Sequence, residues 1–375
     1  MQIIHQLIET SGFYNLTYQN IIMIVIACIF LYLGIKKGYE PYLMIPISFG
    51  MLLVNLPLAN MMAEPTKAEA GGLLYYLYQG TNLGIYPPLI FLCLGASTDF
   101  EPLLANPKTI LLGGAAQFGI FVAFFLAASW GMSPQEAASV GIIGGADGPT
   151  ALFLTSKLAP HLLSAIALAA YSYMALIPII QPPIIKLLTT QKERRVVMKV
   201  GRKVSQREKI IFPIVVTIFV SLLIPSAATL ISCLMLGNLV KESGVVPNIT
   251  TVLQNALMYG ITIILGLTVG AKADGALFLS TTTLKITLLG LIAFAGGTAA
   301  GVLMGKLMCY LTGGKVNPMI GAAGVSAVPM AARVVHKEGQ KEDPENFLLM
   351  HAMGPNVAGV IGSAIAAGIL LAFFS

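Results

Sequence analysis

The sequence predicts an all-α membrane protein, a polytopic helical bundle of about ten spans with two further segments that are broken or re-entrant. Of its 375 residues, 56% are hydrophobic and only 10% are charged, whereas soluble proteins carry roughly 25% charged residues. The apolar residues form blocks of about 17–25, the length that crosses a hydrocarbon core of about 30 Å as a helix. Aromatic residues make up only 8%, and no alternating pattern of about ten residues indicates an outer-membrane barrel.

Short polar connections, many with Pro or Gly, separate the apolar blocks. The expected spans are residues 20–36, 41–58, 86–98, 109–129, 139–156, 163–181, 211–224, 226–241, 253–271, 284–309, 318–333 and 347–374. Two of the twelve differ from the others, because 139–156 and 317–335 are rich in Gly, Ala and Pro and contain polar residues.

The net charge of +6 comes largely from one cluster. Nine of the twenty-two Lys and Arg residues lie between Lys186 and Lys209, against two acids in that stretch. Such a cluster marks a cytoplasmic loop of a membrane protein, so no nucleic-acid partner is expected. The four cysteines lie in apolar runs without C-x-x-C spacing and the four histidines are scattered, which argues against a metal cluster built from these residues.

The direction of the chain across the membrane predicts that 139–156 does not cross it. Lys36 and Lys37 place the end of the first span inside, and the next three spans then bring the chain to the outside near Trp130. A full crossing by 139–156 would leave the basic loop outside. A segment that enters and returns leaves it inside, so we expect 139–156 to be re-entrant or broken.

Weak internal similarity divides the chain into two halves. GIIGGADGPTA (141–151) resembles PMIGAAGVSAVPMA (318–331), and two other pairs of segments match in the same order with offsets of 174–183 residues. We expect a first repeat over 1–185, a basic cytoplasmic loop over 186–209 and a second, inverted repeat over 210–375. Inverted repeats with broken segments near the midplane are typical of secondary transporters, which combine scaffold and mobile core parts. The alternative is chance similarity among small apolar residues.

Asp147 is the one acid that cannot be placed in a loop or at the end of a span. It lies within GIIGGADGPTALFL, where a carboxylate costs about 2.5–3.5 kcal/mol to insert. An unwound Gly-rich backbone exposes carbonyl oxygens, which together with this carboxylate suit a hard cation such as Na⁺. The alternative is a carboxylate that only binds the freed backbone amides.

The second unusual segment offers Asn317, Ser326 and the flexible Gly321 and Gly324, with Arg333 at its end. Arg333 is either functional or a cation that extends to the membrane surface. Two further polar residues lie in apolar stretches: Tyr173 in AYSYMALIPIIQPP, an interfacial anchor or a functional phenol, and Asn356 in HAMGPNVAGVIGS.

Three motifs together resemble a known family. GGADGPTA around Asp147, AYSYMALIPIIQPP around Tyr173 and NPMIGAAGVSAVPMAARVV from Asn317 to Arg333 are similar to the β subunit of the sodium-ion-translocating decarboxylases. That family serves oxaloacetate, methylmalonyl-CoA and glutaconyl-CoA decarboxylase complexes. The resemblance covers nearly the whole chain, and the short N-terminal region favours an acyl-CoA decarboxylase complex.

The resemblance implies a translocase of the bacterial inner membrane. Such a subunit decarboxylates carboxybiotin, takes up a proton and exports Na⁺. For this chain we expect an elevator-type movement, in which the two broken segments move as a rigid body against the scaffold. The implied partners are a biotin carrier subunit, a carboxyltransferase α subunit, a small membrane subunit of γ/δ type and further copies of β. Biotin is carried by the partner, since this chain has no lysine in an A-M-K context.

The resemblance also implies roles for six residues. Asp147, Asn317, Gly321, Ser326 and Tyr173 are expected to bind Na⁺, and Arg333 is expected to bind carboxybiotin. Arg333, Tyr173 and Asp147 are the expected catalytic residues. The sequence leaves two other functions open: a Na⁺-coupled carboxylate transporter or Na⁺/H⁺ antiporter, and a membrane anchor for soluble subunits that transports nothing.

Overall fold

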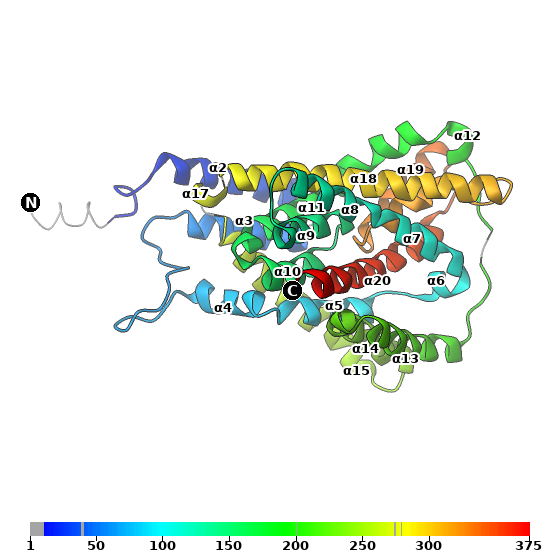
Figure 1. Ribbon diagram of the computed structural model, residues 1–375, viewed down its shortest axis with the longest axis horizontal. Coiled ribbons are helices and arrows are strands. Elements are labelled where there is room, and N and C mark those ends of the chain that lie inside the picture. The colour runs from blue at the N-terminus through cyan, green and yellow to red at the C-terminus, as the bar shows by residue number, and fades with distance from the viewer. Residues whose placement is uncertain (1–10, 39–40, 200, 274, 279) are drawn as a thin grey trace, which may run out of the picture.

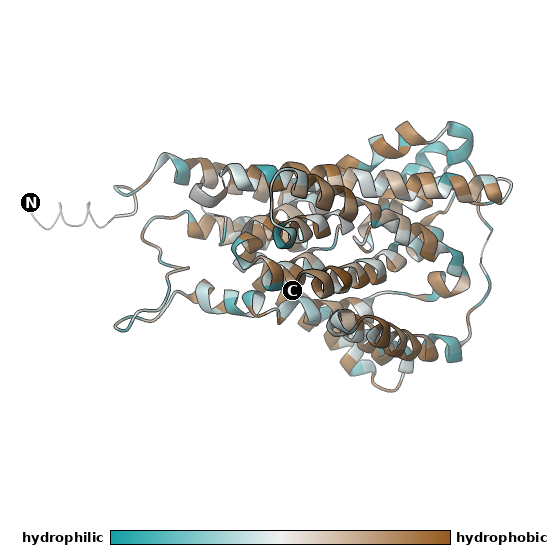
Figure 2. Cartoon of the chain, in the orientation of Figure 1, coloured by the Kyte–Doolittle hydropathy of each residue, from teal (hydrophilic) through white to brown (hydrophobic). Residues whose placement is uncertain are grey.

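The computed structural model describes residues 11–38, 41–199, 201–273, 275–278 and 280–375. Within these ranges every regular element is a helix. The helices run mostly along the long axis of the molecule (Figure 1). In Figure 2 the middle of the molecule is mainly apolar, and hydrophilic segments gather toward its ends, most clearly around α12.

Helices occur at all the predicted spans. The long ones are α2 (Tyr18–Lys37), α11 (Leu163–Leu188), α13 (Gln206–Leu223), α18 (Thr281–Leu311) and α20 (Leu349–Phe374). The others at predicted spans are α3 (Pro41–Val54), α5 (Tyr86–Ser97), α7 (Ile110–Ala116), α8 (Phe118–Ser129), α14 (Ala228–Ser243) and α16 (Met258–Gly270). Five short helices among the described residues were not predicted: α4 (Leu73–Asn82), α6 (Glu101–Ala105), α12 (Gln191–Arg194), α15 (Pro247–Val252) and α17 (Gly275–Phe278).

Five continuous helical stretches in the described residues are long and apolar enough to cross a membrane. They are Tyr18–Lys37, Pro107–Ser129, Pro247–Gly270, Thr281–Leu311 and Leu349–Phe374. Helix α11 bends by 63° near its middle and makes a sixth if both its parts form one span. Pro41–Val54 and Tyr86–Ser97 are shorter apolar helices. The expected number of about ten crossings stays a prediction.

Both segments that the sequence predicts to be broken are interrupted. In the first, α9 (Pro134–Gly141) is followed by a 3₁₀ turn, η2 (Ile142–Gly145), and α10 begins only at Gly148 (Gly148–Leu158). Between them Ala146 adopts the left-handed conformation, with φ of 55°. In the second, η6 (Pro318–Gly324) leads through an extended stretch into α19 (Met330–Glu342). A Pro near the first position of each new helical piece is preorganised for that start.

Helix α18 holds both broken segments through a line of glycines. A Cβ on Gly297 would meet the carbonyls of Ala116 and Gly144. One turn further, Gly301 and Gly321 touch each other's carbonyl groups, and Gly305 lies against Pro318. Only residues without a Cβ permit backbones this close. The first segment therefore meets α18 two turns away from the start of η6.

Two pairs of helices cross at reciprocal glycine contacts. In α3 and α16, Gly50 faces the Leu267 carbonyl while Gly270 faces the Ile47 carbonyl. In α5 and α14, Gly95 faces the Leu234 carbonyl while Gly237 faces the Leu92 carbonyl. Small residues let membrane helices approach closely and gain packing energy. In the view of Figure 1, α14 lies near the lower edge of the molecule and α18 near its upper edge.

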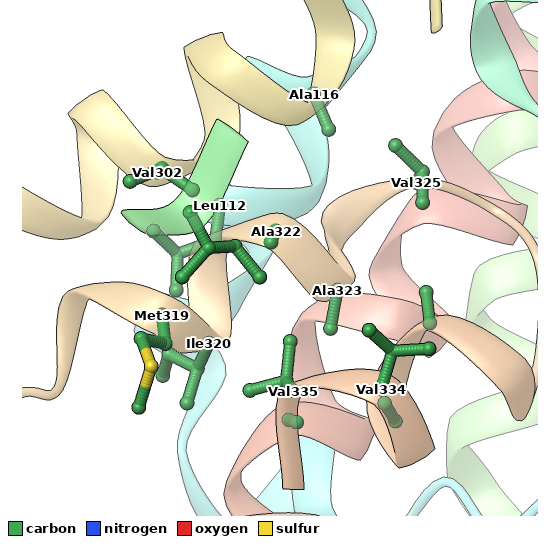
Figure 3. Close-up of a cluster of buried hydrophobic side chains, with 14 of the residues drawn as sticks. Leu112, Ala116, Val302, Met319, Ile320, Ala322, Ala323, Val325, Val334 and Val335 are labelled. Atoms are coloured by element: carbon green, nitrogen blue, oxygen red, sulfur yellow. The ribbon is translucent and has the colours of Figure 1, made fainter. Parts of the chain in front are cut away.

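The second broken segment is embedded in an apolar cluster. Met319, Ile320 and Ala322 of η6 pack with Leu112 of α7 and Val302 of α18, and all five are fully buried. Figure 3 shows these side chains together with Val334 and Val335 of α19. Burial of apolar side chains stabilises this arrangement by roughly 25 cal/mol per Å².

The chain between α11 and α13 is fastened to the core at the end that carries the basic cluster. We call residues 189–198 the clasp segment. Its Arg194 donates to Glu342 of α19 at 2.7 Å, and both side chains are only about 15% exposed. The same guanidinium donates to the Thr189 carbonyl at 2.6 Å.

Two asparagines hold the backbone of the clasp segment. Asn317 donates to the carbonyls of Arg194 and Val196, each at 2.9 Å, and Asn346 donates to that of Val196 at 3.2 Å. Lys306 of α18 pairs with Glu193 of the clasp segment at 3.5 Å. The clasp segment is thereby tied to η6, α18 and α19.

Gly301→Val will destabilise the protein, because the added side chain must displace the Gly321 backbone. Overpacking of this kind costs about 1–3 kcal/mol, so the thermal unfolding midpoint of the purified subunit in detergent should fall. Gly260→Ala in α16 is the matched control, since nothing lies within 4 Å of its would-be Cβ. Equal midpoints for both variants would contradict the tight contact.

The Arg194–Glu342 pair will make stability depend on pH. The hydrogen bond from Arg194 lowers the pKa of Glu342 below its usual value. A group with a lowered folded-state pKa contributes stability above its unfolded pKa and loses it as the pH falls through its folded pKa. Between pH 7 and pH 3, the unfolding midpoint of the wild type should therefore fall further than that of Glu342→Gln. Glu345→Gln, at an exposed residue, is the control and should follow the wild type.

Candidate functional site

Asp147 lies at the break of the first segment and caps helix α10. One carboxylate oxygen accepts from the Thr150 amide at 3.0 Å, a typical N-cap interaction. The other accepts from the Ser363 hydroxyl of α20 at 2.7 Å. The side chain is 4% exposed and has no ion-pair partner among the described residues. A buried carboxylate is costly unless a positive charge accompanies it.

The two broken segments meet beside Asp147. The Ser326 amide donates to the Gly145 carbonyl at 2.9 Å, and the Ser326 hydroxyl donates to the Gly359 carbonyl of α20 at 2.8 Å. Ser326 thus joins η2, the end of η6 and α20. Of the residues predicted from the sequence, Asp147 and Ser326 are the two that lie together.

Gln117 belongs to the same cluster and was not predicted. It occupies the break between α7 and α8, and its amide nitrogen donates to the carbonyls of Gly113 and Gly359 at 3.3 and 3.2 Å. Its side-chain oxygen is buried without a hydrogen-bond donor among the described residues. A Cβ at Gly145 would lie 3.2 Å from that oxygen. Gln117 therefore presents an unused oxygen to the backbone just before Asp147.

Asn356, which the sequence analysis singled out in α20, has a similar arrangement. Its amide nitrogen donates to the carbonyls of Ala323 and Val325 at 2.9 and 2.7 Å, and its oxygen is buried without a donor. Asn356 and Ser363 lie seven residues apart on α20, which places them on one face of that helix. Buried polar atoms without hydrogen-bond partners are uncommon in proteins.

Two tyrosines of α11 have different positions. The hydroxyl of Tyr173 donates to the Thr287 carbonyl of α18, and its ring lies against Gly290. Tyr171, which was not predicted, packs its ring against Gly148, next to Asp147, and its buried hydroxyl has no partner in the described part of the chain. Tyr173 therefore joins α11 to α18, while Tyr171 is the tyrosine beside Asp147.

Asn317 and Gly321 lie at other positions along α18 than the break that contains Asp147. Gly144 meets α18 at Gly297, whereas Pro318 meets it at Gly305. Eight residues of helix correspond to about 12 Å, so Asn317 is about 12 Å nearer to the clasp segment than Gly144 is. Its side-chain nitrogen is used by the clasp segment, and its oxygen accepts from the Met319 amide at 3.0 Å. The structure does not bring the predicted Na⁺ residues together as one site.

Arg333 is exposed on the first turn of α19. Its neighbours Ala332 and Val334 are buried in the cluster around η6. No carboxylate of the described residues lies within ion-pair distance of it. Its guanidinium is therefore available to an anionic ligand.

Polar side chains that sequence reasoning passed over complete the candidate site: Gln117, Thr150, Tyr171 and Ser363. Each lies in an otherwise apolar block, so a polar residue at membrane depth was the available signal. Gln117 sits in the middle of the predicted span 109–129, and Ser363 lies in that of 347–374. The sequence does not show how each helix is rotated about its axis, and this rotation decides whether the side chain lies near Asp147.

Comparison with known proteins identifies a single family over nearly the whole chain. The model of the family described as "Na⁺-transporting oxaloacetate decarboxylase beta subunit" matches residues 19–374. Methylmalonyl-CoA decarboxylase subunit beta of Propionigenium modestum is 60% identical over 393 residues, with all of both chains covered. Glutaconyl-CoA decarboxylase subunit beta of Acidaminococcus fermentans is 55% identical over 365 residues, covering 97% of this chain and 96% of the relative.

A third relative is named for a different substrate, oxaloacetate. The oxaloacetate decarboxylase beta chain of Klebsiella pneumoniae is 48% identical over 429 residues, covering 100% of this chain and 99% of the relative. The match of the family model over nearly all residues, together with these identities, settles the classification. The chain belongs to the family of Na⁺-transporting oxaloacetate decarboxylase beta subunits.

Proposed function

We propose that the chain is the inner-membrane subunit of a biotin-dependent decarboxylase Na⁺ pump. It decarboxylates carboxybiotin on a carrier subunit, takes up a proton and exports Na⁺. The observation that carries this proposal is the buried Asp147 carboxylate, which has two hydrogen-bond donors and no cationic side chain. Membership of a Na⁺-transporting decarboxylase family supports it.

The Na⁺ site that we propose centres on Asp147. The Gln117 oxygen lies beside Gly145 and has no donor, and the Ser363 hydroxyl already touches the carboxylate. Carboxylate, amide and hydroxyl oxygens are the ligands that a hard cation prefers. We include Ser326, because it lies at this level. We assign Gly321 and Asn317 to the approach from the clasp segment, about 6 Å and about 12 Å from the Gly144 level along α18.

The decarboxylation that we propose is balanced by one proton. The bond between the biotin nitrogen and the carboxylate carbon breaks, CO₂ leaves, and the nitrogen receives a proton. Arg333 would hold the carboxylate, since a guanidinium can bind it bidentately. Loss of CO₂ removes that negative charge. Tyr173 would connect this event to the ion site through α18, to which its hydroxyl is hydrogen-bonded.

Coupling to transport needs two states of access. We propose that the two halves are inverted repeats and that α18 and the broken segments move as an elevator-type core. The reciprocal glycine crossings support the repeats, because α3 pairs with α16 in the way that α14 pairs with α5. Moving one charge outward works against about 2.3 kcal/mol per 100 mV, which decarboxylation would supply.

The upstream substrate that we propose is an acyl-CoA such as methylmalonyl-CoA. The relative named for that reaction is 60% identical over 393 aligned residues, whereas one named for oxaloacetate is 48% identical over 429. A carboxyltransferase subunit, a biotin carrier and a small γ/δ-type membrane subunit would complete the complex, with several copies of this chain.

Asp147→Asn will abolish most Na⁺ stimulation. An ion pair at the effective dielectric of a protein is worth about 4 kcal/mol at 4 Å, so the half-saturating Na⁺ concentration should rise by more than about 100-fold. The measurement is decarboxylation of free carboxybiotin and ²²Na⁺ movement by the complex in proteoliposomes. Glu345→Gln serves as the control for an exposed acid. Movement of Na⁺ by the wild type without response to carboxybiotin would replace the pump with a secondary transporter.

Ser363→Ala will have a smaller effect in the same direction. It removes one neutral ligand and one donor to Asp147, and the half-saturating Na⁺ concentration should rise by about tenfold, the effect of about 1.4 kcal/mol. Ser139→Ala is the matched control, because Ser139 of α9 is a buried serine whose hydroxyl has no partner among the described residues. An unchanged Na⁺ response in Ser363→Ala would place the ion away from α20.

A further inference from the structure

Helix α19 carries a row of cations that begins at Arg333. Arg333, Lys337 and Lys341 are spaced by four residues and are all exposed, so they lie above one another on the same face of the helix. The opposite face, with Val334, Val335 and Glu338, is buried. The row therefore runs from the start of α19 to the end that faces the clasp segment.

Nearby acids are engaged by other cations. Glu338 pairs with Lys341 and with Lys186 of α11, and Glu342 pairs with Arg194. Arg333 and Lys337 have no carboxylate within ion-pair distance in the ranges that the structure describes. Two neighbouring cations without counter-charge raise the local potential and attract anions.

The position of this row of cations indicates from which side an anionic ligand reaches it. Arg333 lies nine residues before Glu342, about 13 Å along the helix, and is nevertheless exposed. Val328, just before α19, packs with the apolar cluster of α5, α13 and α14. The start of α19 therefore lies where the broken segment meets these outer helices, and the row leads to it from the end that carries the basic loop.

We propose that Lys337 is a second binding residue for the anionic carboxylated ring, which it contacts before Arg333 does. This inference rests on the proposed function. A lysine ammonium is a mobile point charge without directional demands, which suits a first contact, whereas the guanidinium fork fixes a carboxylate in one geometry. Lys341 does not share the role, because Glu338 neutralises it.

The kinetic test compares Lys337→Gln with the wild type in free carboxybiotin decarboxylation by the whole complex in phosphatidylcholine vesicles. KM should rise by up to about fivefold, the effect of one exposed charge pair, while kcat stays within about twofold. Lys337→Arg should restore KM, and the matched control Lys341→Gln should leave both constants unchanged. An unchanged KM in Lys337→Gln would overturn the proposal.

A second measurement reports the potential without relying on catalysis. With the exposed Cys28 replaced by Ser, Arg333→Cys is modified with sulfonatoethyl or trimethylammonioethyl methanethiosulfonate. The anionic reagent should react faster relative to the cationic one when Lys337 is present than when Lys337→Gln is added. Equal rate ratios would refute the cationic row. A wild type that decarboxylates nothing while these ratios differ would instead refute the proposed function.

A membrane-anchoring role for Lys337 predicts a different pattern. In that case the KM difference would vanish in phosphatidylcholine and appear only in vesicles with phosphatidylglycerol. That outcome would assign Lys337 to lipid headgroups and overturn its role as a substrate contact.

Discussion

Backbone that leaves the helical path in an apolar interior must still have its carbonyl oxygens satisfied, and side-chain amides meet this requirement here. Gln181 donates to the Ala322 carbonyl at 2.8 Å, and Asn356 donates to those of Ala323 and Val325. Without such donors an unwound segment at membrane depth is costly. Helices α11 and α20 supply these donors to the second broken segment.

Side-chain amides also leave oxygen atoms near Asp147. An amide whose nitrogen donates to a carbonyl still has its oxygen, and the Gln117 oxygen beside Gly145 remains without a donor in the described part of the chain. Asp147 caps α10 with one oxygen and accepts from Ser363 with the other. The Thr150 amide is therefore the one freed amide that Asp147 binds, and its other oxygen accepts from a side-chain hydroxyl.

Close glycine contacts join the two broken segments through one helix. Helix α18 meets the first broken segment at Gly297 and the second at Gly301 and Gly305, so it connects the Asp147 level with the level of the clasp segment. Ion pairs and asparagines then fasten the clasp segment to α19 and η6. Arg333 therefore lies on a helix whose preceding segment, η6, packs directly against α18.

The sequence by itself determined the helical class, the positions of the apolar helices and the two interruptions, one of which contains the buried Asp147, because hydropathy and Gly/Pro content are local properties. It did not determine which polar side chains surround Asp147: Gln117, Tyr171 and Ser363 come from three different helices. Nor did it give the whole register between the halves. The glycine contacts relate Gly95 to Gly270, 175 residues apart and within the predicted offsets of 174–183, but they relate Gly50 to Gly237, 187 residues apart, about one helical turn beyond that range. Segments of small apolar residues match about equally well when one is shifted by a helical turn, so sequence similarity does not fix their register. The packed helices fix it, because a glycine must stand wherever a Cβ would collide with the facing backbone.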